Sequence, residues 1–150
     1  MIRVGVVGLG TIGRRICLAI EAGIPGIALV GATGRDRPKA EAFLGSLASK
    51  PPFLPTEELI QASDLVIESA TQAALQELAP KELGAGKDLM VLSCGVLLGR
   101  SDWVELATRN HCRILVPSGA IAGLDGVKGA RVGAITAVTM ESRKPPRGWA

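Results

Sequence analysis

The feature that most constrains this chain is a glycine-rich turn close to its first residue. The turn, Gly8-Leu9-Gly10-Thr11-Ile12-Gly13, directly follows the β-branched and almost wholly apolar run Ile2 to Val7. Such a run is typical of a strand buried on both faces, as in a parallel sheet. After the turn, apolar residues recur at helical spacing, at Ile12, Ile16, Ala19 and Ile20. A second apolar run at Ile27 to Ala32 completes a predicted βαβ unit.

The alternation of strands and helices continues along the chain. Apolar runs predict strands at Asp64–Glu68, Leu89–Leu92 and Arg113–Val116. Helices are predicted between the strands, at Pro38–Leu47, Thr56–Ala62, Gln72–Leu83 and Ser101–Asn110. Pro80 marks a break or a restart within the third of these helices. Strands separated by helices of this length predict an α/β fold with a doubly wound parallel sheet, the Rossmann arrangement.

The C-terminal part of the sequence has a different pattern. Residues 117–126 are mostly small and predict a turn that leads into a short helix near Val127. Ala134 to Ser142 is more polar and is predicted as a strand, which would leave an unpaired edge if it stood alone. We therefore expect a first domain over residues 1–122. Residues 123–150 would form a connecting helix and the first strand of a second, mostly absent domain.

Composition and charge exclude several classes of protein. The 150 residues are 47% hydrophobic and 21% charged, which is a globular balance. Aromatic residues make up 3%, with no tyrosine, which argues against a nucleic-acid partner bound by base stacking. The uncharged stretches are too short to span a membrane, and the first residues run straight into a strand, so we expect a cytoplasmic protein without a signal peptide. Three cysteines and one histidine lack ligand spacing, which predicts free thiols and no metal site.

The glycine turn has the G-x-G-x-x-G spacing that binds dinucleotides. Its glycines allow a tight turn, a close approach of the backbone to a pyrophosphate, and close packing of helix on strand. The helix beginning at Thr11 adds unpaired N–H groups and a partial positive charge. The expected cofactor is NADP or NAD, held by Gly8, Leu9, Gly10, Thr11, Ile12 and Gly13. The alternative, a glycine turn that binds nothing, is disfavoured by the flanking strands and helix.

The end of the second predicted strand bears on which cofactor binds. An NAD site usually has Asp or Glu there, about twenty residues after the glycines, to bind the ribose hydroxyls. This chain has Thr33 or Gly34 at that place, followed by Arg35, Asp36 and Arg37. Because a guanidinium pairs with a 2′-phosphate in a fork geometry, the pattern favours NADP, with Thr33, Gly34 and Arg35 as contacts. Two alternatives stay open: Asp36 swings in to serve NAD, or the arginines form a solvated loop.

Five segments, the glycine turn among them, occur in a characteristic order along the chain. They are Gly8 to Gly13, Glu68-Ser69-Ala70-Thr71-Gln72-Ala73-Ala74, Leu92-Ser93-Cys94-Gly95, Pro117 to Asp125 and Ser142-Arg143-Lys144-Pro145-Pro146. Together they resemble the L-aspartate dehydrogenase family across essentially the whole chain. The resemblance implies reversible, NAD(P)-dependent conversion of a dicarboxylic amino acid, L-aspartate, to iminoaspartate or to oxaloacetate plus ammonia. This reaction can feed the synthesis of NAD. A Rossmann domain followed by an α/β catalytic domain, commonly in a homodimer, is also implied.

The same resemblance implies additional cofactor contacts. Ala120 corresponds to a family alanine that contacts the cofactor. The segments Ala70-Thr71-Gln72 and Ser93-Cys94-Gly95 follow strand ends, where the nicotinamide half would run. Thr71 and Gln72 could equally cap the helix that follows them. The family's catalytic histidine would lie beyond the end of this chain, so no residue here is expected to take that role.

Two residues with reactive side chains are interpreted as structural. His111 lies at the end of a predicted helix, on the side of the sheet opposite the ligand crevice, where the helix dipole explains it. Cys94 has no visible base beside it and is interpreted as a small packing residue near the nicotinamide. Two other functions stay open. One is a stand-alone NAD(P)-binding or redox-sensing module without catalysis. The other is an enzyme similar to homoserine dehydrogenase or dihydrodipicolinate reductase.

Overall fold

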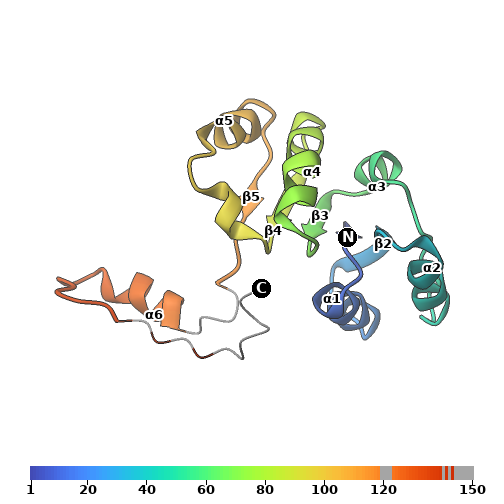
Figure 1. The fold of residues 1–150 in the computed structure, drawn as a ribbon, viewed down its shortest axis with the longest axis horizontal. Coiled ribbons are helices and arrows are strands. Elements are labelled where there is room, and N and C mark those ends of the chain that lie inside the picture. The colour runs from blue at the N-terminus through green and yellow to red at the C-terminus, as the bar shows by residue number, and fades with distance from the viewer. Residues whose placement is uncertain (119–122, 140, 142, 144–150) are drawn as a thin grey trace. The chain divides into compact units, whose positions relative to one another are not determined.

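The computed structural model describes residues 1–118, 123–139, 141 and 143 (Figure 1). The chain forms two compact units, Met1–Pro117 and Ser118–Ala150, and each is described by itself. The predicted domain boundary after residue 122 stays a prediction, because residues 119–122 lie outside the described part of the chain.

The first unit contains a parallel sheet of five strands. The strands are β1 Ile2–Val7, β2 Ile27–Thr33, β3 Leu65–Glu68, β4 Asp88–Val91 and β5 Ile114–Leu115. Their order in the sheet is β2-β1-β3-β4-β5, and each neighbouring pair is parallel. From β1 the chain proceeds first to one side of the sheet and then, from β3 onward, to the other. Such a reversal opens a crevice at the carboxyl ends of the strands, and it confirms the predicted doubly wound, Rossmann-like fold.

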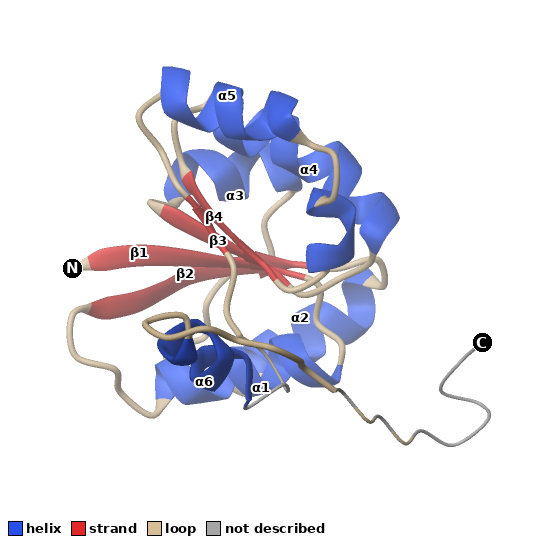
Figure 2. Ribbon diagram, turned by 90° about the vertical axis from the view of Figure 1, so that its left-hand side faces the viewer, coloured by secondary structure: helices blue, strands red, loops and turns tan. Residues whose placement is uncertain are grey.

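Helices cover both faces of the sheet (Figure 2). They are α1 Thr11–Glu21, α2 Arg37–Gly45, α3 Thr56–Ala62, α4 Gln72–Gly84 and α5 Ser101–Arg109, with a short 3₁₀ helix η1 at Cys94–Leu97. One face is covered by α1 and α2, and the other by α3, α4 and α5, so that two apolar cores form. The predicted break at Pro80 is wrong, because α4 continues through it. Burial of Leu78, Ala79 and Leu83 on the same helix offsets the hydrogen bond that the proline cannot make.

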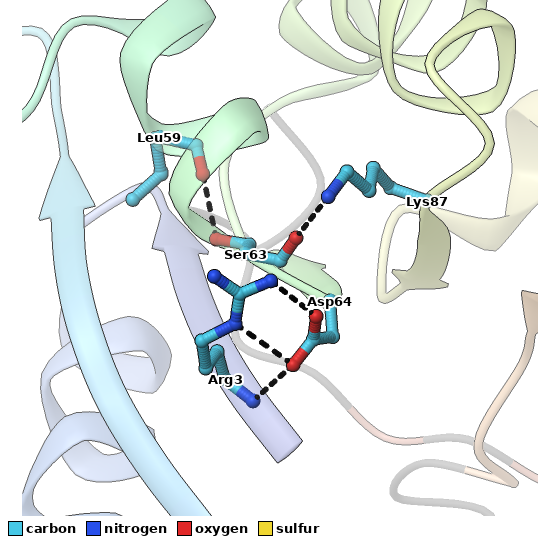
Figure 3. A network of polar contacts seen from close by, with 5 residues as sticks. All are labelled: Arg3, Leu59, Ser63, Asp64 and Lys87. Atoms are coloured by element: carbon cyan, nitrogen blue, oxygen red, sulfur yellow. Dashed lines mark hydrogen bonds and ion pairs between the residues drawn. The ribbon is translucent and has the colours of Figure 1, made fainter.

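Polar contacts close the amino-terminal edge of the sheet (Figure 3). Arg3 donates from its backbone N–H and its guanidinium to the carboxylate of Asp64, at distances of 2.6 to 3.1 Å, which joins β1 to β3. These hydrogen bonds hold the pKa of Asp64 well below its usual range. The Ser63 hydroxyl donates to the Leu59 carbonyl, and Lys87 donates to the Ser63 carbonyl over 2.8 Å. The opposite, carboxyl-terminal edge carries the crevice.

The outer edge of β2 is covered by a short segment of the α2–α3 connection. Ala32 donates its N–H to the carbonyl of Pro52 over 3.1 Å and accepts a hydrogen bond from the N–H of Leu54 over 3.0 Å. These contacts make an isolated parallel bridge between Ala32 and Phe53. The last element of the sheet on this side is therefore a single bridge and not a further strand.

The second unit contains the helix α6, Gly123–Ala130, as predicted near Val127. The predicted strand from Ala134 to Ser142 is wrong for the residues described: 134–139 and 141 belong to no strand, and residues 140 and 142 lie outside the description. A strand forms only where its N–H and C=O groups pair with a neighbour, and no described strand pairs with this segment. No described helix of either unit is long and apolar enough to cross a membrane.

Candidate functional site

A cavity of about 580 Å³ lies at the carboxyl ends of β1, β2 and β3, where the strand order reverses. Its walls come from the glycine turn, the end of β2, the first turn of α2 and the segment after β3. The residues that sequence analysis assigned to the cofactor and that line this cavity are Gly8, Leu9, Gly10, Thr33, Gly34, Arg35, Ala70 and Thr71. The fold therefore brings together three groups of predicted residues, from segments far apart in the sequence.

The glycine turn has a geometry that side chains would not permit. Gly8 has a φ of +94°, and a Cβ added to it would lie 2.6 Å from the carbonyl oxygen of Ser69. A Cβ on Gly13 would lie 1.8 Å from the carbonyl oxygen of Gly8, so α1 packs directly against the turn. A Cβ on Gly10 would meet nothing within 4 Å. The first and third glycines are thus required for packing, while the second leaves open space beside the backbone.

This geometry fits the phosphates of a dinucleotide. Gly10 is the N-cap of α1, and it provides no side chain to accept hydrogen bonds from the first N–H groups of the helix. The first turn of α1 also contains no acidic residue. Unpaired N–H groups and the positive end of the helix dipole bind anions. A pyrophosphate can therefore approach the open backbone at Gly10, as the spacing of the motif predicts.

Arg35 is the arginine after β2 that lines the cavity. Arg37 is not in the cavity lining: it forms an ion pair with Glu41 at 2.8 Å and its guanidinium lies 5.1 Å from the centre of the Phe53 ring. Asp36 caps α2 by accepting the backbone N–H of Lys39 over 3.1 Å, and it pairs with the Lys39 ammonium at 2.9 Å. Hydrogen bonding to Lys39 lowers the pKa of Asp36. In this arrangement the aspartate already has a structural role.

Sequence analysis missed two cations in the cavity lining, Arg14 and Lys39. The Arg14 guanidinium donates to the carbonyl of Leu9 over 3.0 Å and lies 4.9 Å from the centre of the Phe43 ring. Both residues belong to the first turns of helices that begin beside the cavity. The available signal was their spacing from the start of each helix. Arg14 lies four residues after Gly10, and Lys39 lies three residues after Asp36, and residues so spaced share a helix face.

The segment after β3 contacts the glycine turn. The Ser69 hydroxyl donates to the carbonyl of Gly8 over 2.8 Å, next to Ala70 and Thr71 in the cavity wall. Thr71 caps α4 by accepting the N–H of Ala74 over 3.2 Å, so the capping role that the sequence left open is the one observed, beside the cavity.

A buried glutamate at the end of β3 was also missed as a functional residue. Glu68 accepts hydrogen bonds from Ala70 and Ser93, and its carboxylate lies just behind the cavity wall. The available signal was an acidic residue at the end of an otherwise apolar strand, because a charge is rarely buried without a specific role.

The remaining predicted residues lie outside the cavity lining. Thr11, Ile12 and Gly13 belong to α1, and Gly13 packs under the turn. Ser93, Cys94 and Gly95 follow β4, where Cys94 is exposed. The Gln72 side chain lies close to Gly95, 3.4 Å from where a Cβ would be. Ala120 lies outside the described residues, so its assignment stays a prediction.

The other reactive groups lie away from this edge. His111 directly follows the C-cap of α5 with a φ of 55°, at the helix end that the sequence predicted. Cys17 and Cys112 are buried, and burial raises the pKa of the Cys17 thiol to about 11. Within the described residues, no three His, Cys, Asp or Glu side chains are grouped so that they could hold a metal ion.

Known proteins similar to this chain include several L-aspartate dehydrogenases. The L-aspartate dehydrogenase of Methanocella arvoryzae is 41% identical over 151 residues, which cover 99% of this chain and 56% of that protein. That of Bradyrhizobium diazoefficiens is 41% identical over 147 residues, covering 98% of this chain and 52% of that protein. The family resemblance drawn from the sequence is thereby confirmed. The chain spans about half the length of the curated relatives it matches.

Solved structures agree with the fold, and a family model indicates the cofactor class. UDP-N-acetylglucosamine 3-dehydrogenase from Acidithiobacillus ferrooxidans superposes with a TM-score of 0.72 at 18% identity, covering 89% of this chain and 44% of that one, which shows a shared fold. The family model described as the NAD-binding domain of homoserine dehydrogenase matches residues 8–117. That match includes the glycine turn and every strand of the sheet after β1. The chain therefore belongs to the homoserine dehydrogenase NAD-binding domain family, whose members bind a nicotinamide cofactor.

Proposed function

We propose that this chain is the cofactor-binding part of an NAD(P)-dependent L-aspartate dehydrogenase. The observation that carries the proposal is the glycine turn, which leaves open backbone at Gly10 beside a cavity at the strand-order reversal. The similarity to L-aspartate dehydrogenases over nearly the whole chain supports the substrate, a dicarboxylic amino acid. When bound, a nicotinamide cofactor supplies the acceptor or donor of a hydride. The proposal includes a catalytic domain, a homodimer and a cytoplasmic location, which rest on the family resemblance.

The chain's own residues bind and orient the cofactor in this proposal. The N–H groups of the turn and of the first residues of α1 hold the pyrophosphate. Arg35 lies at the end of β2, and Lys39 lies one helical turn further on in the same cavity wall. Asp36 lines the same wall and pairs with Lys39, so Arg35, Asp36 and Lys39 together carry a net positive charge. This net charge favours a 2′-phosphate, so we propose that NADP binds in preference to NAD. Asp36 holds the ammonium of Lys39 and caps α2, which leaves it engaged when ribose hydroxyls approach.

Replacing Arg35 with alanine is expected to weaken NADPH binding by about ten- to a hundredfold, the equivalent of a charge-assisted hydrogen bond of ~1.5–3 kcal/mol. NADH binding should stay almost unchanged, because NADH has no 2′-phosphate. The measurement is a titration of the purified chain with each reduced cofactor, followed by nicotinamide fluorescence.

Arg37→Ala is the matched control, because this arginine is two residues away and directed toward Glu41 and Phe53. It should leave both affinities unchanged. Equal affinity for NADPH and NADH, with no effect of Arg35→Ala, would contradict the preference for NADP. Failure of both reduced cofactors to bind the unaltered chain would contradict the proposed function itself.

A homoserine dehydrogenase is the second candidate, favoured by the description of the matching family model. The two candidates differ in the substrate that reduces the cofactor. Reduction of NADP⁺ or NAD⁺ by the whole protein, catalytic domain included, with L-aspartate and not with L-homoserine supports the first candidate. The reverse result supports the second.

A further inference from the structure

The last residue of β3, Glu68, is fully buried at the carboxyl-terminal edge of the sheet. It lies between Val7 of β1 and Val91 of β4 in the register of the sheet. Its side chain forms no ion pair with a described residue. A buried carboxylate without a cation is stable only where several donors replace water. The hydrogen bonds of Glu68 therefore indicate what the residue does.

Both carboxylate oxygens of Glu68 accept hydrogen bonds from loops at the same edge. Oε1 accepts the N–H of Ala70 and the hydroxyl of Ser93, each over 2.8 Å, and Oε2 accepts the N–H of Ser93 over 2.9 Å. Ala70 is part of the cavity wall after β3, whereas Ser93 follows β4. One side chain thus sets the spacing between two loops from neighbouring strands.

The same short segment is connected to the glycine turn. Ser69, next to Glu68, donates its hydroxyl to the carbonyl of Gly8 over 2.8 Å and its N–H to the carbonyl of Val7, also over 2.8 Å. Residues 68–70 therefore link three loops: the turn after β1, the segment after β3 and the segment after β4. The end of β2 joins these contacts through the turn, where Gly8 donates its N–H to the carbonyl of Thr33 over 2.9 Å.

We propose that Glu68 is a positioning residue for the nicotinamide end of the cofactor. The inference rests on the proposed function. In a doubly wound sheet the two halves of a dinucleotide lie on opposite sides of the strand-order reversal. Thr33 ends β2 on one side, with Gly34 and Arg35 after it, and the loops held by Glu68 follow β3 and β4 on the other side. Glu68 consequently acts on the half of the site opposite the adenosine, without contacting the cofactor itself.

Glu68→Gln tests this proposal with almost no change in side-chain shape. The substitution converts one acceptor oxygen into an NH₂ group, which must face a backbone N–H or a hydroxyl that formerly donated to the carboxylate. The two probes are NADPH and 2′-phospho-ADP-ribose, which lacks only the nicotinamide ring. We expect the affinity for NADPH to fall by about tenfold or more, as when buried donors lose their acceptor. The affinity for the ring-free ligand should change by less than about threefold.

The fluorescence of bound NADPH gives a second readout of the ring's surroundings. In Glu68→Gln its emission should move toward that of free NADPH, because the ring is held less firmly between the two loops. A purely structural role for Glu68 predicts instead that both ligands lose affinity equally and that the emission of the bound fraction is unchanged. That result, or unchanged affinity for both ligands, would overturn the proposal.

Glu82→Gln is the matched control, since Glu82 is the other fully buried glutamate of the described residues. It lies in the last turn of α4, ten residues beyond Gln72 and away from the cavity. Both affinities should stay at their original values.

Ser93→Ala tests the proposal if Glu68→Gln does not fold, because it removes only the hydroxyl donor. The Ser93→Ala substitution should lower the affinity for NADPH by about threefold and leave the affinity for the ring-free ligand unchanged. Failure of the unaltered chain to bind either ligand would instead refute the proposed function.

Discussion

Replacing Gly13 with alanine is expected to destabilise the first unit by ~1–3 kcal/mol or more and to abolish cofactor binding. The added methyl carbon would lie 1.8 Å from the carbonyl oxygen of Gly8 and 2.6 Å from the hydroxyl oxygen of Ser69. The first of these atoms belongs to the backbone of the turn, so the strain cannot be relieved by rotating a side chain. Either α1 moves away from the sheet or the turn changes shape, and both changes disrupt the phosphate site. Thermal unfolding and NADPH titration of the same preparation measure the two effects.

Substitutions at two other glycines distinguish an effect on packing from an effect on cofactor binding. Gly45→Ala, also at a helical position, adds a methyl group that meets nothing within 4 Å, so it should stabilise the fold by ~0.5–1 kcal/mol without affecting the cofactor. Gly10→Ala also meets nothing within the protein, but its methyl group enters the space where the pyrophosphate approaches. It should therefore lose NADPH binding while unfolding close to the original temperature. A Gly13→Ala variant as stable as the unaltered chain would contradict the packing interpretation.

The second large expected effect is a dependence of stability on pH, and it comes from Glu82. Burial raises the pKa of this carboxyl from 4.5 to about 8, and neither of its oxygens has a hydrogen-bond partner among the described residues. Below pH 4.5 the group is protonated in both the folded and the unfolded state. Between pH 4.5 and about 8 the unfolded state releases the proton while the folded state retains it. The free energy of unfolding should therefore fall across this range, by ~1.4 kcal/mol per pH unit at most and a few kcal/mol in total.

Urea unfolding of the chain at a series of pH values between 5 and 9 checks this prediction. Glu82→Gln cannot ionise, so it should remove most of the slope and be more stable than the unaltered chain at pH 9. Glu77→Gln is the control, because Glu77 lies on the same helix but is exposed. It should keep the slope. Asp88 contributes only at lower pH. Its pKa is lowered by the hydrogen bond from Arg113, so the stability that it provides is lost as its carboxylate is protonated. A flat profile between pH 5 and 8 would contradict the buried, protonated state of Glu82.

Much of the fold could be predicted because its strands are short apolar runs separated by helices of regular spacing. The bounds of β1 agree with the prediction at both ends, and every other strand of the sheet lies within a residue or two of it. The strand predicted from Ala134 failed for a different reason. Local composition favours extended backbone, but a strand also requires a neighbour to pair with, and the sequence of the segment does not specify one.

The site was predictable where it depends on the backbone. The roles of Gly8, Gly10 and Gly13 follow from their spacing: the chain path requires glycine at Gly8 and Gly13, and Gly10 leaves the backbone open to a phosphate. The directions in which side chains point were harder to predict from the sequence. Arg35 and Arg37 are equivalent in the sequence, yet only the first lines the cavity, because the second is held by Glu41 and Phe53. Such contacts depend on the packing of α2.

The hydrogen-bond partners of Glu68 could not be predicted from the sequence for a related reason. An acidic residue at the end of a strand usually contacts solvent or a ligand. Its actual donors, Ala70 and Ser93, lie on two different loops, and Ser93 is separated from it by 25 positions. Only the parallel register of β3 with β4 brings these groups together.

The bridge beside β2 determines where this sheet can be extended. Ala32 already uses its N–H and C=O groups on Pro52 and Leu54, and the prolines at 51, 52 and 55 have no N–H to offer an incoming strand. Strand addition from another molecule is thus blocked at the carboxyl-terminal end of β2. The opposite border is β5, with only two residues. A designed extension of the sheet on the β2 side would therefore have to pair with the residues before Ala32.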